Sequence, residues 1–173
     1  MRATRRTLTI LFLPLLLLAW LGAMVVNADI APAFIEVWTA DGDINGDWLG
    51  YAVGTAGDVN GDDYADVIIG APNDKNTVDK EGVVYVYHGS AGGLTKSNLG
   101  ADWIASSGQQ GANFGAAVST AGDVNGDGYD DIIVGAYHYK TYTQVGAAFV
   151  FFGSSSGLAT TPGWSLIGDQ QNS

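Results

Sequence analysis

Hydrophobic and polar positions recur along this chain with a period of about 65 residues. The sequence LGYAVGTAGDVNGDDYADVIIGAP at 49–72 returns as FGAAVSTAGDVNGDGYDDIIVGAY at 114–137. The similarity continues downstream, where 81–94 returns at 145–158 after a deletion of one residue. A pattern that keeps its phase over such a distance indicates a repeat architecture, in which each unit packs against its neighbours.

Each unit is expected to form four short strands. Those of the first unit are predicted at residues 51–53, 67–69, 83–87 and 103–105. The second is an unbroken run of β-branched residues, which indicates burial on both faces. Four strands per unit, with glycine and aromatic residues at fixed positions, are typical of a propeller blade. We therefore predict an all-β fold, a partial β-propeller of about two four-stranded antiparallel blades.

The repeat sets the expected organisation of the chain. Repeat one covers about 38–102 and repeat two about 103–168, and the first aromatic-glycine pair of a third unit would fall at 175. Repeat units bury their faces against neighbours, and at least three are usually needed for stability. We therefore expect further propeller repeats as partners, either in the intact chain or in another chain.

The first 28 residues have the character of an export signal. Arg2, Arg5 and Arg6 precede a long apolar run, and Val26-Asn27-Ala28 fits the small-residue pattern of a cleavage site. The alternative is an uncleaved membrane anchor, since the run is about long enough to span a bilayer. In both cases we expect 1–28 to be a leader and 29–173 to be extracellular or at the cell surface.

The composition of the chain excludes several kinds of site and function. The chain has no Cys, which excludes disulfides and thiolate metal sites. After residue 28 there are 4 Lys, no Arg and 18 acids, or a charge of 4 − 18 = −14, so no basic footprint for nucleic acid is present. Sixteen of the acids are Asp, a residue that favours turns and oxygen-rich metal loops.

The acidic loop of each repeat carries the candidate chemistry. Positions 1, 3, 5 and 9 hold side-chain oxygens, and an aromatic residue at position 7 can offer its backbone carbonyl. The predicted ligands are Asp58, Asn60, Asp62, Tyr64 and Asp66 in the first loop, and Asp123, Asn125, Asp127, Tyr129 and Asp131 in the second. A flexible set of oxygen ligands favours Ca²⁺ over Mg²⁺. An EF-hand is excluded, because position 12 holds Ile69 or Val134 instead of Glu.

Electrostatics supports the same interpretation. Two carboxylates about 6 Å apart repel by roughly 1 kcal/mol in water and by about 3 kcal/mol at an effective dielectric of 20. Each loop has three such anions and a fourth acid nearby, Asp63 or Asp130. A divalent ion relieves this repulsion, so two calcium sites are predicted. The alternative is that Asp and Asn simply fill a solvated turn.

These motifs resemble a known family. The aromatic-glycine start, the Asp-Val-Asn-Gly-Asp loop and the Gly-Ala-Pro end are similar to the FG-GAP repeat of integrin α-subunit β-propellers and of many bacterial surface proteins. Two positions depart from the pattern, with Leu49 in place of Phe and Tyr137 in place of Pro. The resemblance implies a calcium-stiffened propeller for adhesion or extracellular recognition, with a protein or glycan ligand. It also implies that the metal is structural and faces away from the ligand.

Two other segments of the sequence resemble functional motifs. Gly153 to Gly157 matches the G-x-S-x-G pattern of a hydrolase nucleophile, but the repeat partner of Ser155 is Ala91 and no helix is expected to follow. We therefore predict that the chain is not an enzyme. The segment 41–47 resembles a third metal loop, but its repeat partner 106–112 has no acids, which favours an exposed turn.

Two alternative functions remain open from the sequence. Trp38, Trp103 and Trp164 recur at one position of the repeat, which indicates core packing, but tryptophan can also stack on sugar rings in a lectin-like propeller. The second alternative is a recognition module that accompanies a catalytic domain absent from this chain.

Overall fold

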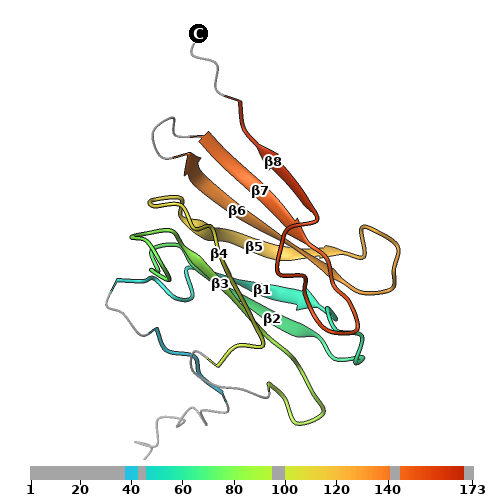
Figure 1. Ribbon diagram of the computed structural model, residues 1–173. Coiled ribbons are helices and arrows are strands. Elements are labelled where there is room, and N and C mark those ends of the chain that lie inside the picture. The colour runs from blue at the N-terminus through green and yellow to red at the C-terminus, as the bar shows by residue number, and fades with distance from the viewer. Residues whose placement is uncertain (1–37, 43–45, 95–99, 141–144, 170–173) are drawn as a thin grey trace, which may run out of the picture. The chain divides into compact units, whose positions relative to one another are not determined.

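Eight strands form two four-stranded antiparallel sheets, each with its strands in chain order (Figure 1). The computed structural model describes residues 38–42, 46–94, 100–140 and 145–169. The first sheet, blade 1, contains β1 (Ala52–Gly57), β2 (Asp66–Ala71), β3 (Val83–Tyr87) and β4 (Trp103–Ser106). The second sheet, blade 2, contains β5 (Phe114–Gly122), β6 (Asp131–Lys140), β7 (Val145–Phe151) and β8 (Trp164–Ile167).

The two blades repeat the same register. Ile69 pairs with Tyr85 in blade 1, and Val134 pairs with Phe149 in blade 2. The prediction of two four-stranded antiparallel blades is therefore confirmed. The first strand differs in extent, since it begins at Ala52 and continues to Gly57, so that Tyr51 precedes it.

No helix is present in the described ranges, and consequently none there is long and apolar enough to cross a membrane. The predicted leader, 1–28, lies outside the described residues. The whole of the described chain falls within one compact unit, Glu36–Ser173.

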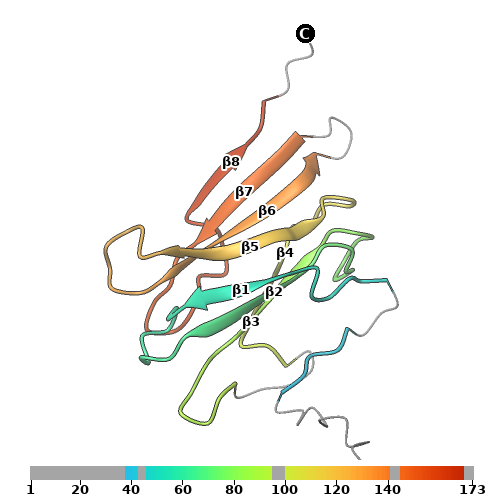
Figure 2. The ribbon, with the colours of Figure 1, turned by 180° about the vertical axis from the view of Figure 1, so that it is seen from behind.

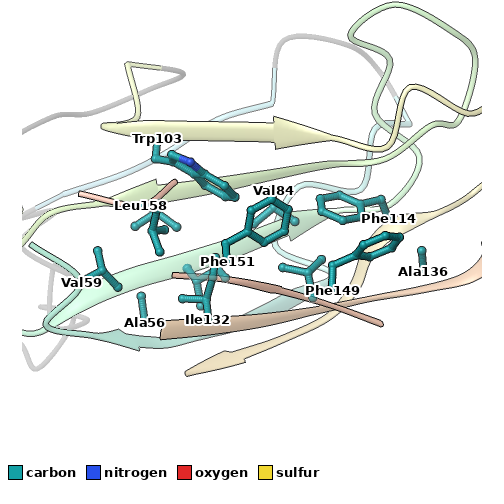
Figure 3. Packing of buried hydrophobic residues seen from close by; sticks show 13 residues of the cluster. Ala56, Val59, Val84, Trp103, Phe114, Ile132, Ala136, Phe149, Phe151 and Leu158 are labelled. Carbon is teal, nitrogen blue, oxygen red and sulfur yellow. The ribbon is translucent and has the colours of Figure 1, made fainter. Parts of the chain in front are cut away.

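The alternation of side chains along the strands puts one apolar face of blade 1 against one apolar face of blade 2 (Figure 3). Phe114 packs edge-on against Phe149 and Phe151, with ring centroids 5.7 and 6.2 Å apart. The buried members of this shared core are Ala56, Val59, Ile68, Val84, Val86, Trp103, Phe114, Ile132, Val134, Ala136, Phe149, Phe151 and Leu158. The core therefore lies between the blades, and neither blade has a separate core on this side.

Two of the three tryptophans that recur in the repeat make equivalent aromatic contacts. Trp103 of β4 meets Phe151 of β7 edge-on at 5.0 Å, and its indole N–H donates to the carbonyl of Ala159 at 3.0 Å. Trp38 meets Tyr87 of β3 in the same way, at 4.8 Å. Core packing is thus confirmed for Trp38 and Trp103, whereas Trp164 is 49% exposed.

We expect Trp103→Ala to lower the free energy of unfolding by about 3–5 kcal/mol, because it leaves a cavity between the blades and removes the hydrogen bond to Ala159. The matched control is Trp164→Ala, the same position in blade 2, which should cost less than about 1 kcal/mol because that side chain is half exposed. Urea denaturation of both variants tests the difference, and equal costs would contradict the assignment of the core.

Candidate metal centre

The two predicted metal loops connect equivalent strands. The first joins β1 to β2 and the second joins β5 to β6, and both lie at the same end of the two blades (Figures 1 and 2). Each loop leaves the sheet after a glycine of positive φ, Gly57 or Gly122, and returns to it at an aspartate. The repeat therefore places ten predicted ligands in two neighbouring loops.

Asp58 organises the first loop. Its Oδ1 accepts hydrogen bonds from the backbone N–H groups of Gly61 at 2.7 Å and Asp62 at 3.0 Å, and its Oδ2 accepts one from Asp63 at 2.8 Å. The carboxylate at position 1 thus turns three consecutive backbone donors toward itself. This wraps the loop around the side chain, because the donors follow the carboxylate by three to five residues.

The side chains at positions 3 and 5 are joined to each other. The Asn60 amide donates to Asp62 Oδ2 at 3.0 Å, and the Asp62 N–H donates to Asn60 Oδ1 at 3.1 Å. The N–H of Tyr64 donates to Asp62 Oδ1 at 3.0 Å. Three of the predicted ligand residues are therefore held together on one exposed side of the loop.

Asp66, at position 9, is placed differently. It is 1% exposed, and its two oxygens accept hydrogen bonds from the N–H groups of Val59 and Gly89 at 2.9 and 2.8 Å. Burial raises the pKa of Asp66 above its usual value, although both hydrogen bonds lower it. The residue thus ties the start of the metal loop to the turn that follows β3.

The second loop repeats these contacts almost atom for atom. Asp123 accepts hydrogen bonds from the N–H groups of Gly126, Asp127 and Gly128 at 2.7, 3.0 and 2.9 Å. Asn125 and Asp127 exchange hydrogen bonds at 2.8 and 3.0 Å, and the Tyr129 N–H donates to Asp127 at 3.0 Å. Asp131 accepts from the N–H groups of Val124 and Gly153, each at 2.9 Å. The N–H of Gly128 lowers the pKa of Asp123, with help from the N–H groups of Gly126 and Asp127. The predicted equivalence of the two loops therefore extends to their geometry.

The carboxylates of a loop do not converge on one point. Within the described ranges, no three His, Cys, Asp or Glu side chains are arranged to hold a metal ion. The donor chemistry nevertheless suits a hard cation, because the predicted ligands offer only oxygen atoms for coordination. A carboxylate oxygen has about two acceptor positions, so the hydrogen bonds to the backbone do not exhaust these groups.

The two loops have different residues at one position where their backbone conformation is similar. Position 6 takes a left-handed conformation in both, with φ of 69° at Asp63 and 93° at Gly128. Glycine adopts this region without steric cost, whereas other residues are strained there, Asp less than most. Loop one therefore keeps an acidic side chain at a position where loop two has the better-suited residue.

The loops are also connected to each other, through a residue that sequence reasoning assigned only to charge repulsion. Asp130 Oδ2 accepts a hydrogen bond from the Asp58 N–H at 2.9 Å, and the Asp130 N–H donates to the Asp58 carbonyl at 3.0 Å. Gly61 lies so close to Tyr129 that an added Cβ would be 2.5 Å from its ring. In the first loop the position equivalent to Asp130 holds Ala65. This difference between the two loops is the feature of the sequence that could have pointed to the role of Asp130.

A buried carboxylate at the opposite end of blade 1 was missed entirely by sequence reasoning. Glu81 is fully buried and accepts hydrogen bonds from the N–H groups of Thr77 and Val78 in its own loop, and from Gly108 in the loop after β4. Burial raises the pKa of Glu81, but these hydrogen bonds outweigh it and the pKa is lowered. Its repeat partner is Val145, so the periodicity gave no indication of this role.

Two other predicted features have clear positions. Ser155 is exposed in the turn between β7 and β8, and no helix follows it within the described part of the chain. In the segment 41–47, residues 43–45 lie outside the described residues; Asp41 is exposed as expected, but Asp47 is buried. Asp47 Oδ1 accepts the N–H of Leu49 at 3.2 Å, so the last acid of this segment helps to form the entry to blade 1.

Comparison with known proteins identifies the same two repeats. The family model described as FG-GAP repeat matches residues 49–87 and 114–151. Over 118 residues the chain is 38% identical to Integrin alpha-PS5 of Drosophila melanogaster, which covers 68% of this chain and 11% of that protein. Human Integrin alpha-6 is 37% identical over 116 residues, 66% of this chain and 9% of its own length. Rat Integrin alpha-7 is 32% identical over 155 residues, 86% of this chain and 12% of its own length.

Two repeated four-stranded antiparallel sheets define the described chain as part of a β-propeller. The chain belongs to the FG-GAP repeat family, and the integrin α subunits are its relatives. It spans about a tenth of the length of the curated relatives that it matches.

The conformation at position 6 generates a prediction for the loops without added metal. We expect Asp63→Gly to raise the free energy of unfolding by about 0.5–1 kcal/mol, because it removes the strain at φ 69° and one of the crowded negative charges. The reverse change in loop two, Gly128→Asp, should lower it by a similar amount. Denaturation in the presence of a chelator measures both, and a destabilising Asp63→Gly would show that this carboxylate has a structural partner.

The lowered pKa of Glu81 generates a prediction about pH. At neutral pH, Glu81→Gln should lower the free energy of unfolding by about 1–3 kcal/mol, since one buried acceptor becomes a donor. Because the folded-state pKa lies below the ordinary value of 4.5, the stabilisation by Glu81 is complete above about that pH and is lost as pH falls through the folded-state pKa.

The difference between wild type and Glu81→Gln should therefore shrink on acidification, as measured by denaturation between pH 7 and pH 3. Asp79→Asn is the control, since it removes the same charge from an exposed side chain in the same loop and should change stability by less than about 0.5 kcal/mol. A difference that grows on acidification would contradict the assignment.

Proposed function

We propose that this chain is part of an extracellular, calcium-binding FG-GAP β-propeller that acts in adhesion or protein recognition and has no catalytic activity. The observation that carries the proposal is the pair of acidic loops, whose ligand residues and hydrogen bonds repeat at equivalent positions of two blades. A solvated turn has no need of three crowded carboxylates in each copy. The relationship to integrin α subunits supports the same role.

The residues that would hold calcium are the ones that the repeat predicts. In the first loop these are Asp58, Asn60, Asp62, Asp66 and the carbonyl of Tyr64, and in the second Asp123, Asn125, Asp127, Asp131 and the carbonyl of Tyr129. The bound ion supplies positive charge that compensates the carboxylates. Asp66 is 1% exposed and has only the N–H groups of Val59 and Gly89 as hydrogen-bond donors among the described residues, so a cation beside it would compensate a buried charge.

The residues around the loops would transmit this stiffening to the fold. Asp66 links the first loop to the turn after β3, and Asp130 links the second loop to the backbone of the first. A closed loop therefore stabilises both the hairpin that carries it and the contact between blades. Calcium would then stabilise the fold and would not itself contact the recognised partner, as the resemblance to the family implies.

The opposite end of the blades is the better candidate for the partner surface. The sequence between the second and third strands differs between units, since 73–80 shares little with 137–144, of which 137–140 belong to β6, whereas the acidic loops are nearly identical. Loops that vary on a repeated scaffold are where binding specificity usually lies. We propose an extracellular protein or glycan as the ligand, and further propeller repeats as structural partners. The leader at 1–28 would export the domain 29–173 to the cell surface or medium.

The lectin alternative loses support from the packing of the tryptophans. Trp103 is 8% exposed and Trp38 is partly buried against Tyr87, so among the three recurring tryptophans Trp164, at 49% exposure, offers the most ring surface to a sugar. No observation on the described residues favours the alternative of a module that accompanies a catalytic domain.

Calcium titration tests the proposal. The melting temperature should rise with calcium, with dissociation constants on the order of 10⁻⁴ to 10⁻³ M; at one hundred times the dissociation constant each site adds about 2.7 kcal/mol. The double variant Asp58→Ala, Asp123→Ala should lose the calcium-dependent rise, whatever its stability in chelator.

The matched control is the pair Asp79→Ala, Asp102→Ala, which removes the same total charge at two positions outside the metal loops and should keep the full response. Calorimetric titration counts the sites directly, with two expected. A wild-type melting temperature that is the same in calcium and in chelator would refute the calcium assignment.

A further inference from the structure

A hollow of about 330 Å³ lies where β4, the edge strand of blade 1, faces blade 2. Ser106 and Ser107 line this hollow on the side of blade 1, and Thr160 and Pro162 line it from the segment between β7 and β8. The hollow, named here the interblade groove, lies at the lower end of the usual size of small-molecule sites, about 300–1,000 Å³. It is therefore large enough for a ligand of one or two rings.

The floor of the interblade groove is aromatic. The buried residues Phe114, Phe149 and Phe151 line it, and their rings lie side by side (Figure 3). Tyr139 of β6 extends this surface, because its ring centroid is 4.9 Å from that of Phe149. Such a floor suits the apolar face of a ligand ring.

Polar groups with unused hydrogen-bonding capacity surround this floor. Within the described ranges, the hydroxyls of Tyr139 and Thr160 make no hydrogen bond, and Asn76 uses only its amide nitrogen, which donates to Ser106 Oγ at 3.3 Å. Polar groups that are open to solvent bind water, so a ligand that covers them must return those hydrogen bonds. The groove therefore favours a ligand with several hydroxyl groups.

The contact between the blades does not require this polar lining. The repeat counterpart of Ser106 is Ile167, because Ser106 pairs with Val83 as Ile167 pairs with Ala147. The same place in the repeat is thus polar where the groove lies and apolar at the edge of blade 2. The hydroxyl at Ser106 belongs to this groove and not to the repeat.

The charge of the lining narrows the ligand further. None of the described residues that line the groove is charged, although the chain as a whole is strongly acidic. An anionic or cationic ligand would lose its hydration here without gaining an opposite charge. An acyl chain would cover the polar groups of Asn76, Tyr139 and Thr160 without hydrogen bonds. The chemistry that fits is a neutral, polyhydroxylated ring.

We propose that the interblade groove binds one neutral sugar residue of an extracellular glycan. The hydroxyls of Tyr139 and Thr160 and the amide of Asn76 exchange hydrogen bonds with the sugar hydroxyls, while the C–H face of the sugar lies over the aromatic floor. The site does not involve the recurring tryptophans. The inference rests on the proposed role in extracellular recognition and specifies a glycan as one ligand of this part of the molecule.

Calorimetric titration of the full chain with the methyl glycosides of galactose, mannose, fucose and N-acetylglucosamine tests the proposal. We expect at least one of these neutral sugars to bind with a dissociation constant on the order of 10⁻³ M, as suits a ligand of this size. Sialic acid and glucosamine, which carry a charge, should bind more weakly than that sugar.

Two variants place the sugar in the groove. Tyr139→Phe keeps the aromatic ring and removes the hydroxyl, so it should raise the dissociation constant by about fivefold or more. Thr160→Trp fills the mouth of the groove and should abolish binding. Because Thr160 is exposed, the melting temperature of that variant should change by less than about 1 °C, which separates lost binding from lost folding.

Three matched controls lie outside the residues that line the groove. Tyr137→Phe makes the same change two residues away on β6, and Thr161→Trp places the same bulk on the next exposed residue. Trp164→Ala removes the exposed tryptophan of blade 2. All three should keep the affinity of the wild type.

Either of two results would overturn the proposal. One is an absence of binding at about 20 mM of each neutral sugar, a concentration well above the expected dissociation constant. The other is binding that survives Thr160→Trp or is lost in Trp164→Ala, which would put the sugar elsewhere on the surface.

The titrations are made with calcium and with chelator, beside the melting curves of the same samples. Sugar binding in a chain whose melting temperature ignores calcium would support the groove and refute only the metal assignment. A calcium-dependent rise without sugar binding would refute only the groove.

Discussion

Burial of apolar surface between neighbouring sheets is the constraint on which the rest of this structure depends. A single four-stranded sheet with apolar side chains on both faces cannot remove them from water by itself. The ring cluster of Phe114, Phe149 and Phe151 lies between the sheets, where each blade supplies one wall of a shared core. Each blade therefore depends on its contact with the neighbouring blade for stability and is not a separate folding unit.

The position of the acidic loops follows from this contact. Once the two sheets face each other with the same strand order, the loops after β1 and β5 must lie at the same end and next to each other. Asp130 uses this proximity by accepting the N–H of Asp58, and Tyr129 lies against Gly61. The acidic loop of blade 1 is thereby in direct contact with the acidic loop of blade 2.

Much of the fold could be predicted because its causes are local or periodic. The β-branched run at 67–69 indicated a buried strand, and Ile68 and Ile69 are buried on opposite faces. The order of oxygen-bearing residues in the acidic loops was evident from their spacing, and the two loops proved to have matching hydrogen bonds. Glu81 and Asp130 were not recognised as structural residues, because their partners Gly108 and Asp58 are far away in sequence and their roles are not repeated.

The sequence by itself determined the repeat, the strands and the oxygen-rich loops, since these depend on residue types within a few positions of one another. Only the tertiary structure decided at which glycines a side chain would clash: a Cβ at Gly70 or Gly82 would collide with the backbone of the following blade, whereas one at Gly135 or Gly146 would meet only ordinary contacts of 3.4 Å or more. It also decided that Trp103 is buried and Trp164 exposed, although the two occupy the same place in the repeat. The physical reason is that burial is a property of the neighbouring surface, which a repeating local pattern does not encode.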